Sequence, residues 1–487
     1  MKTVLCLLLA MTIASPTIAS PSQPRTTGPG RIGASWSPVY GLPPIKPDRF
    51  MPQLRALGGG FSRVTLYWTQ LEPQPGKPRW DELDAYLDQL AAPDEGMITL
   101  ASASPWATRT RAAIFPSSPA KDPQTYYAFV RRVVEHCAGR VRYFQADTEP
   151  SNGFFWAGSA EEYAAEQRTF YRAVKDADPK AIVVLGGSDG LFDPSGQDPL
   201  PNQQANLAFL DTVLRDAAGA YDLFDLHLYA DPYTIPARVA LVREKMRANG
   251  GEKPVIASEM SGPGFFEFKG NRRYAGALFG PSAGADAIRK LRQSLDTLPP
   301  EARMFLDTPA STAGQQLLRV QTEDLVIRSV LALSAGVERA AWFEIWHDNR
   351  DPDSTHDIIN SPTGLFTRND GGLASATPLG AVFSRVAQVL GEARSVTRID
   401  VAGEDDVQAY RIDQAGTPPL LIAWRRPPRR GEEVAPRPAR LRWSSPSCTA
   451  TRADGAPVAV TCSNGAAELA LTDMPVFIGK RPLPGAR

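Results

Sequence analysis

Short runs of β-branched and aromatic residues alternate with amphipathic stretches along most of the chain. The runs are bounded by Gly, Pro or polar residues, as strands are, whereas the stretches between them repeat apolar residues at a helical period. The eight predicted strands are Arg31–Ser37, Phe61–Trp68, Met97–Ala103, Val141–Asp147, Ala181–Gly187, Leu223–Tyr229, Pro254–Ser258 and Ala340–Ile345. The predicted helices are Pro47–Leu57, Trp80–Leu90, Pro123–Ala138, Ser159–Ala177, Asn202–Ala218, Pro236–Ala248, Ala285–Leu295, Thr322–Ala335 and Pro378–Leu390.

This alternation predicts an α/β fold in which eight parallel strands close into a (β/α)8 TIM barrel. The alternative is an open doubly wound sheet, in which a Gly-rich dinucleotide loop often follows the first strand. Residues 33–37 read Gly-Ala-Ser-Trp-Ser and do not form such a loop, so we favour the barrel. The unit between the last two strands, Met260–Arg339, is the longest, and we expect it to wall one side of a cleft.

The pattern of apolar and polar residues changes from about Val396 onward, where the helical period disappears and short runs of alternating apolar and polar residues follow. This pattern predicts a small C-terminal β-sandwich packed on the barrel. We therefore expect the barrel to span residues 31–394 and the sandwich residues 395–487. The predicted sandwich strands are Val407–Ile412, Leu420–Trp424, Ala439–Trp443, Ala467–Leu471 and Val476–Ile478.

The N-terminus predicts export. A basic start precedes the short apolar run Val4–Ala14, and small residues follow it, which is typical of a secretory signal peptide at residues 1–20. Residues 21–30 read as a linker. The apolar run is too short for a membrane span and no longer one occurs, so we expect a secreted or periplasmic protein with no integral membrane segment after signal removal. Export permits a disulfide between Cys448 and Cys462, while Cys137 is expected to be a buried thiol.

Composition narrows the function classes. Lys plus Arg and Asp plus Glu each number 53, so the formal net charge is zero, which argues against a protein that grips nucleic acid or an anionic membrane. Hydrophobic residues make up 43% and charged residues 22%, as in ordinary globular proteins. With 4 Cys and 4 His the chain has no disulfide scaffold or zinc-finger array. None of these numbers determines the oligomeric state.

Two glutamates follow strands that lie across a barrel from each other. Glu149 ends the fourth strand, in Gln145–Pro150, and Glu259 ends the seventh. Polar residues at the carboxyl ends of barrel strands are the candidates for catalysis. A facing pair of carboxyl groups is what glycoside hydrolysis requires, one to protonate the leaving oxygen and one to attack or to activate water. The alternative is that each Glu only caps a helix or forms an ion pair.

These residues also carry a resemblance. The stretches Leu66–Pro73, Ala177–Val184 and Asp225–Tyr229 make the chain resemble the clan A glycoside hydrolases, closest to the β-xylosidase and α-L-iduronidase-like family with its bacterial exopolysaccharide glycosidases. The resemblance implies a retaining glycosidase with a carbohydrate substrate and no cofactor, in which Glu149 is the acid/base and Glu259 the nucleophile. The chain departs from the clan at Thr148, where the usual residue is an Asn that contacts the sugar 2-hydroxyl.

Other residues are candidates for substrate binding. Arg63 resembles the inward Arg with which the clan holds its nucleophile. His227 and Tyr229 are spaced i, i+2 and are expected to face the barrel mouth together, with Tyr229 bonded to the nucleophile and His227 in contact with substrate or Glu149. Stacking platforms for sugar rings are expected among Trp36, Trp106, Trp342 and Trp346, with core packing as the alternative. Glu344 is a rival carboxylate that could also contact substrate.

Two other function classes remain open at this point. The first is a non-catalytic carbohydrate-binding protein on a degenerate barrel, which Thr148 motivates. The second is a metal-assisted hydrolase that uses His347, Asp348, His356 and Asp357. Because the spacing of these four residues is loose for metal ligands, we expect no metal site there.

Overall fold

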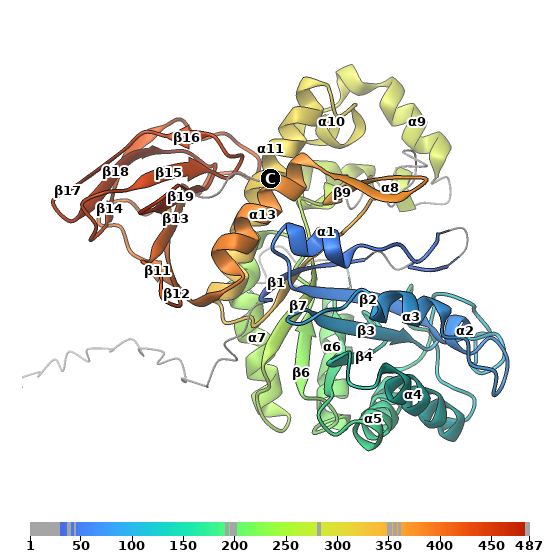
Figure 1. The fold of residues 1–487 in the computed structure, drawn as a ribbon. Coiled ribbons are helices and arrows are strands. Elements are labelled where there is room, and N and C mark those ends of the chain that lie inside the picture. Colours follow the sequence, from blue (N-terminus) through green and yellow to red (C-terminus); the bar gives the residue numbers. More distant parts are fainter. Residues whose placement is uncertain are drawn as a thin grey trace, which may run out of the picture.

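Eight parallel strands close into a barrel in the computed structural model, which describes residues 30–36, 40–42, 45–189, 194, 202–279, 284–347, 353, 358 and 362–482 (Figure 1). The predicted (β/α)8 fold is confirmed, and each strand pairs with its neighbours in chain order. The strands are β1 (Ile32–Ser35), β2 (Phe61–Tyr67), β3 (Glu95–Ala101), β4 (Tyr143–Ala146), β5 (Ile182–Ser188), β6 (Leu223–Leu226), β7 (Val255–Met260) and β8 (Ala340–Phe343).

Helices cover the outside of the barrel and begin where local sequence favours it. Asp122 and Ser159 cap their helices by accepting backbone N–H groups, and Ser159 and Glu162 form a capping box. The helices of the outer layer are α1 (Met51–Ala56), α2 (Trp68–Leu71), α3 (Asp81–Leu87), α4 (Pro123–Cys137), α5 (Ala160–Ala177), α6 (Gln203–Asp216), α7 (Ile235–Ala248), α11 (Thr312–Ser334) and α13 (Pro378–Leu390).

An apolar layer fills the barrel interior below the mouth. Seven of the strands, β2 to β8, each contribute at least one buried side chain to it, among them Phe61, Met97 and Tyr143. The residue two positions further along several of these strands is polar, because side chains alternate between the two faces of a strand. Arg63, Thr99 and Gln145 therefore form the next layer up, toward the carboxyl ends of the strands.

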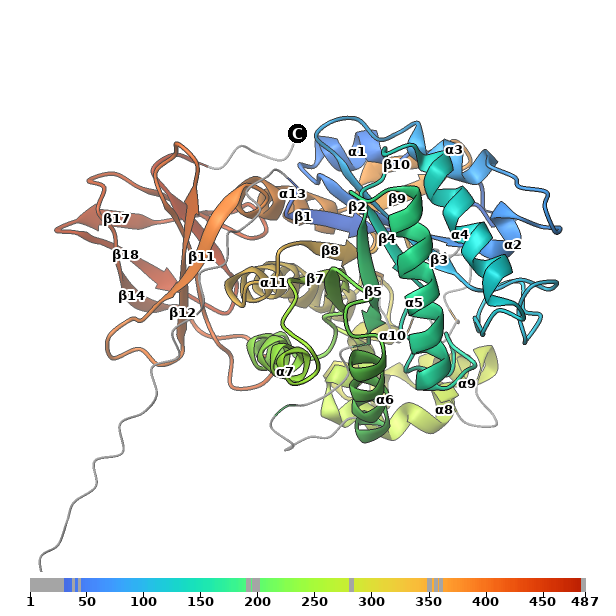
Figure 2. The ribbon, with the colours of Figure 1, turned by 90° about the horizontal axis from the view of Figure 1, so that it is seen from below.

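The long unit between β7 and β8 forms a lobe with its own apolar core (Figure 2). It contains η2 (Phe265–Glu267), η3 (Lys269–Tyr274), α8 (Ala275–Phe279), α9 (Ala285–Gln293), η4 (Leu295–Thr297) and α10 (Pro300–Leu306) before α11. Helix α11 begins ten residues earlier than predicted, where Ser311 accepts the N–H of Gly314 as an N-cap. The apolar pattern that guided the prediction covers only the second half of the helix.

The C-terminal region is a sandwich of two antiparallel sheets, as predicted. One sheet has the order β11-β12-β13-β19-β15-β16, and the other has the order β14-β18-β17. The structure joins Cys448 to Cys462 in a disulfide and leaves Cys137 as a buried free thiol. The strands are β11 (Ala393–Ile399), β12 (Val407–Gln414), β13 (Leu420–Arg425), β14 (Arg437–Arg442), β15 (Thr449–Arg452), β16 (Pro457–Val458), β17 (Val460–Ser463), β18 (Ala466–Leu471) and β19 (Val476–Gly479).

Several short strands were not predicted because their residues are polar or exposed. They are β11, β15, β16 and β17 of the sandwich and the hairpin of β9 (Phe366–Asn369) with β10 (Gly372–Ala376). The predicted signal peptide, residues 1–20, and almost all of the linker lie outside the described residues. Within the part that is described, no helix combines the length and the apolar character that a membrane span requires.

Candidate functional site

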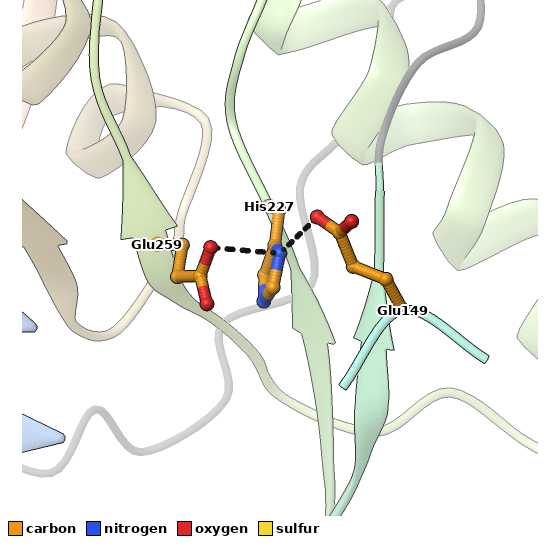
Figure 3. Close-up of side chains that lie close together, drawn as sticks. All are labelled: Glu149, His227 and Glu259. Carbon is orange, nitrogen blue, oxygen red and sulfur yellow. Dashed lines mark hydrogen bonds and ion pairs between the residues drawn. The ribbon is translucent and has the colours of Figure 1, made fainter. Parts of the chain in front are cut away.

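Glu149, His227 and Glu259 meet at the carboxyl ends of β4, β6 and β7 (Figure 3). The imidazole of His227 lies between the two carboxylates, with Nδ1 at 2.7 Å from Oε1 of Glu149 and 3.5 Å from Oε2 of Glu259. One oxygen of Glu149 and one of Glu259 lie within 4.8 Å of each other. The two glutamates that the sequence singled out therefore do face each other across the barrel mouth.

Backbone irregularities at the strand ends make this convergence possible. The pairing of β7 with β8 shifts register between Ala257 and Met260, which lets consecutive residues Ser258 and Glu259 both contact residues of the mouth. Asp147 and Glu149 adopt left-handed backbone conformations, with φ values of 55° and 44°. Such conformations are uncommon for non-glycine residues and cluster at functional sites.

A small residue on β5 leaves room for the histidine. A Cβ atom placed on Gly187 would lie 2.2 Å from Nε2 of His227. Because His227 is completely buried, it could not give way to that atom without losing its partners. Glycine is therefore required at position 187 by the close approach of the imidazole.

Buried hydrogen bonds connect the strands directly beneath the carboxylates. Arg63 Nε donates to Thr99 Oγ1 at 2.8 Å, and Thr99 in turn donates to Gln145 Oε1 at 2.7 Å. Gln145 Nε2 donates to Asp225 Oδ2 at 2.7 Å, and the same oxygen accepts the hydroxyl of Ser258 at 2.5 Å. Because these polar groups have partners with good geometry, they hold the strand ends, and with them the site, in one arrangement.

The carboxylate of Glu259 is held ionised. Arg63 forms an ion pair with Oε1, and the Tyr229 hydroxyl donates to Oε2 at 2.8 Å. Burial by itself would raise the pKa of Glu259, but the charges of His227 and Arg63 and the hydrogen bonds from Tyr229 and Arg63 outweigh it. The net result is a pKa below the usual range of a glutamate. An ionised carboxylate at this position has the form that a nucleophile needs.

The surroundings of the buried His227 favour its protonated form. Burial opposes its charge, but the nearby carboxylates of Glu259 and Asp225, with hydrogen bonds to Asp225 and Glu149, raise its pKa well above the usual range. Its Nε2 lies 3.4 Å from Asp225 Oδ2. Burial likewise opposes ionisation of Asp225, but the charge of His227 lowers the pKa of that carboxyl overall. The imidazole thus favours the ionised forms of Asp225 and Glu259.

Asp147 belongs to a second buried carboxyl pair behind the Glu149 loop. Its Oδ1 accepts the backbone N–H of Ser102 at 2.8 Å, while the Ser102 hydroxyl bonds to Glu166 on α5. Burial raises the pKa of Asp147. Burial and the neighbouring Asp147 raise the pKa of Glu166. Among the described residues, no hydrogen bond joins Asp147 to Glu149.

Two polar atoms at the site have no hydrogen-bond partner among the described residues. They are the hydroxyl of Thr148 and Nη2 of Arg63, both of which are buried. A buried polar group without a partner costs about 1–3 kcal/mol, so such groups commonly await a ligand or a water molecule. Thr148 therefore keeps its hydroxyl available at the position next to Glu149.

The prediction that Trp342 is a sugar platform is wrong. Its side chain is completely buried in the apolar layer between the strands and the outer helices, and its Nε1 donates to the Thr363 carbonyl at 2.9 Å. The inward-facing residue of this stretch is its neighbour Ala341, because the side-chain direction alternates along a strand. Trp36 and Trp346 are also buried in this layer and pack on each other.

Two other candidates, Trp106 and Glu344, bond to residues outside the group formed by Glu149, His227 and Glu259. Trp106 is partly buried, packs edge-on against Trp68 and donates Nε1 to the Glu72 carbonyl at 2.9 Å. Glu344 is buried and bonded to Nδ1 of His347 at 2.6 Å, and among the described residues no hydrogen bond or ion pair joins it to Glu149 or Glu259. Substrate contact by either residue stays a prediction.

The three central residues could also be read as a cation site. Their ligand atoms lie within 4.8 Å of one another, but Arg63 already forms an ion pair with Glu259, and the raised pKa of His227 favours a protonated imidazole. These positive charges oppose a metal ion at the same place. In the loop considered earlier, His347 is bonded to Glu344, while Asp348, His356 and Asp357 lie outside the described residues.

Sequence reasoning overlooked the residues that support the site. Asp225, Ser258, Thr99 and Gln145 are buried polar residues on otherwise apolar strands. The signal that could have found them is their inward position, two residues beyond an apolar interior residue, as for Gln145 after Tyr143. Gly187 gave no signal, because only the position of His227 explains it.

No protein-family model matches the sequence, and no curated protein matches it. Solved structures do match. The fold is that of glycoside hydrolase barrels. A family 39 glycoside hydrolase from Bacteroides cellulosilyticus WH2 superposes with a TM-score of 0.59 at 16% identity, over 93% of this chain and 81% of its own.

Two further solved structures agree in fold. A monomeric β-xylosidase from Caulobacter crescentus CB15 has a TM-score of 0.56 at 15% identity, over 94% of this chain and 98% of its own. A family 30 subfamily 8 xylanase from Clostridium acetobutylicum has a TM-score of 0.53 at 12% identity, over 94% and 98%. These likenesses confirm the fold that the resemblance to clan A predicts.

Proposed function

We propose that the protein is a retaining glycoside hydrolase that acts on a polysaccharide or oligosaccharide. The single observation that carries this proposal is the pair of facing carboxyl groups, Glu149 and Glu259, whose nearer oxygens lie within 4.8 Å. Retaining enzymes keep their two carboxyl groups about 5–5.5 Å apart, whereas inverting enzymes leave about 6.5–9.5 Å for a water molecule. The fold shared with known glycoside hydrolases supports the same reaction class.

In the first half of the reaction, the ionised carboxylate of Glu259 attacks the anomeric carbon as Glu149 gives a proton to the leaving oxygen. In the second half, Glu149 takes a proton from water, which displaces Glu259 from the sugar. Arg63 and Tyr229 orient the nucleophile and keep it ionised. His227 holds Glu149 in place through a hydrogen bond at Nδ1.

The substrate is proposed to be a pyranoside or furanoside of the kinds named for the structural neighbours, which include a β-xylosidase and an α-L-arabinofuranosidase. The free hydroxyl of Thr148 is a candidate contact for a sugar hydroxyl. We also propose that the protein is exported, since residues 1–20 have the pattern of a signal peptide.

The test uses aryl glycosides of xylose, arabinose, glucose and galactose with a good leaving group, which needs no acid catalyst. With azide present, Glu149→Ala should still form the glycosyl-enzyme and yield a glycosyl azide of retained configuration. Glu259→Ala should yield only the inverted azide, because azide then attacks the substrate directly. Glu135→Ala, on the exposed surface of α4, is the control and should behave like wild type. Full activity of both site variants on a glycoside that the wild type cleaves would contradict the proposal.

A non-catalytic carbohydrate-binding protein is the other outcome of this experiment. Binding of glycans without turnover by the wild type, across the whole panel, would favour it over the hydrolase.

A further inference from the structure

Three consecutive backbone carbonyls around Tyr229 are held by two buried arginines. Arg328, on α11, donates Nη1 to the Leu228 carbonyl at 2.7 Å and Nη2 to the Ala230 carbonyl at 2.9 Å. Arg238, on α7, donates Nη2 to the carbonyl of Tyr229 itself at 2.5 Å. Both side chains are completely buried. Since strand β6 ends at Leu226, these guanidinium groups fix a segment that lies beyond the regular sheet.

Carboxylates balance part of this buried positive charge. Asp324 accepts from Arg328 at 2.8 and 3.1 Å, and Glu267, just after β7, lies 3.8 Å from the same guanidinium. Burial, with the charge of Arg328, lowers the pKa of Arg238 to about 9. Buried arginines that face each other require partners, so the positions of Asp324 and Glu267 decide where the two arginines can lie.

The C-terminal sandwich supplies the third arginine of this cluster. Arg430, in the loop after β13, lies 2.7 Å from Glu267 and also forms an ion pair with Asp324. The next residue, Gly431, anchors the loop, because its carbonyl accepts from Gln316 and Arg319 of α11 at 3.0 and 2.8 Å. One residue of the sandwich thus bridges the two carboxylates that hold the Arg328 end of the cluster.

The sandwich reaches the same loop at a second place. Trp424, on β13, donates Nε1 to the Tyr233 hydroxyl at 2.8 Å, and the Arg426 guanidinium lies 4.3 Å from the centre of the Tyr233 ring. Tyr233 lies in η1 (Pro232–Thr234), four residues beyond Tyr229. The loop that carries Tyr229 is therefore fixed at both ends by groups that depend on the sandwich.

We propose that Arg430 is a positioning residue through which the sandwich holds Tyr229 in hydrogen-bonding contact with Glu259. This inference rests on the proposed function, in which Glu259 is the nucleophile. The path has three steps: Arg430 holds Asp324, Asp324 holds Arg328, and Arg328 holds the carbonyls on both sides of Tyr229. The sandwich thereby helps to keep Tyr229 in its position at the site.

Loss of the Arg430 guanidinium frees Asp324 and Glu267 to move toward Arg328 and Arg238, which shifts the clamped carbonyls. A longer hydrogen bond from Tyr229 stabilises the Glu259 carboxylate less, so the pKa of Glu259 rises. The other groups facing Glu259 are Arg63 from β2, His227 after β6 and Glu149 after β4. The change at Arg430 leaves those groups in place.

The experiment compares Arg430→Met with Arg430→Lys in the full-length protein. Arg437→Met is the matched control, because Arg437 forms an exposed ion pair with Asp406 within the same sandwich. The first readout is the titration of Glu259 itself, from carboxyl carbon resonances of protein labelled with 13C at glutamate and assigned by loss of the signal in Glu259→Gln. The second readout is the acid limb of kcat/KM on an aryl glycoside.

We expect Arg430→Met to raise the proton affinity of Glu259 about three- to tenfold, as for partial loss of a hydrogen bond to a charged group. Arg430→Lys should restore part of the shift, and Arg437→Met should cause none. In a Tyr229→Phe background, Arg430→Met should add nothing, since the bond through which it acts is already gone. A merely structural ion pair would instead lower stability and leave the Glu259 titration unchanged.

The inference is overturned if the pKa of Glu259 in Arg430→Met equals that in wild type, while Tyr229→Phe raises it. Should Arg430→Met not fold, Arg430→Lys gives the same comparison, and Trp424→Phe, which removes the hydrogen bond to Tyr233, tests the second contact of the sandwich with this loop. If the wild type cleaves no glycoside, the proposed function fails, but the titration of Glu259 still decides whether the sandwich positions Tyr229.

Discussion

Removal of the Tyr229 hydroxyl isolates one of the interactions that keep Glu259 ionised. The hydroxyl donates to Oε2 at 2.8 Å from a partly buried ring, while Arg63 binds the other oxygen. Tyr229→Phe deletes this single bond and keeps the ring in place. A hydrogen bond to a charged group contributes about 1.5–3 kcal/mol, and one pKa unit corresponds to about 1.4 kcal/mol. The pKa of Glu259 should therefore rise by about 1–2 units.

The assay is the pH dependence of kcat/KM, whose acid limb should report the ionisation of Glu259, the proposed nucleophile, in the free enzyme. The limb of Tyr229→Phe should move toward neutral pH by the same 1–2 units. Tyr127→Phe is the matched control, because the Tyr127 hydroxyl also donates to a carboxylate, Asp176, at 2.7 Å but on the exposed surface. Its acid limb should coincide with that of wild type.

The free energy of unfolding should also be lower in Tyr229→Phe than in wild type. A carboxyl group whose pKa is lowered by folding stabilises the native state above its unfolded pKa, and this contribution disappears as the pH falls through the folded value. The unfolding free energy of Tyr229→Phe should therefore fall short of wild type more at neutral pH than at low pH, as measured by urea denaturation. An acid limb that stays in place while kcat falls equally at every pH would refute the assigned role of Tyr229.

Three further predictions concern the surroundings of the site. Gly187→Ala should abolish most activity, because its Cβ would lie 2.2 Å from Nε2 of His227, whereas Gly276→Ala, with no atom within 4 Å, should match wild type in kcat/KM. Glu166→Gln should become more stable than wild type as the pH rises from about 5 to 8, because ionisation of a carboxyl group whose pKa is raised by burial destabilises the folded state. Urea denaturation at several pH values measures this, and an unfolding free energy that changes equally with pH in both proteins would contradict it. Reduction of the disulfide Cys448–Cys462, which closes a short loop, should lower the unfolding free energy by about 3 kcal/mol. Urea denaturation with and without reductant measures the difference, and no difference would mean that the loop is already compact in the unfolded chain.

The barrel and its two facing glutamates were predictable because they depend on local pattern and on chain order. Alternation of buried strands with amphipathic helices indicates the barrel, and a polar residue at the carboxyl end of a strand must lie at the mouth. The predicted contacts of Tyr229 and His227 follow from the same rule, since residues two apart share a face. These inferences use no contact between distant parts of the chain.

Trp342 shows where that reasoning ends. An aromatic residue on a strand near the mouth can face the substrate or the outer helices, and its identity does not distinguish the two. The structure decides the question through register, since Ala341 faces inward and Trp342 therefore faces outward. A one-residue difference reverses the direction of every side chain on a strand.

The sequence by itself determined the class of fold and the division of the chain into a barrel and a sandwich. It also identified the two glutamates as candidates for catalysis. Arg63, Tyr229 and His227 were expected near these glutamates, but only the tertiary structure decided how they are arranged around the two carboxyl groups and that the sandwich takes part. Arg63 and Tyr229 converge on Glu259, His227 lies between the two carboxylates, and Arg430 reaches in from the sandwich. The ionisation of a carboxyl group in such a site depends on charges and hydrogen bonds within a few ångströms. The fold brings those groups together from positions 30 to 196 residues apart in the chain.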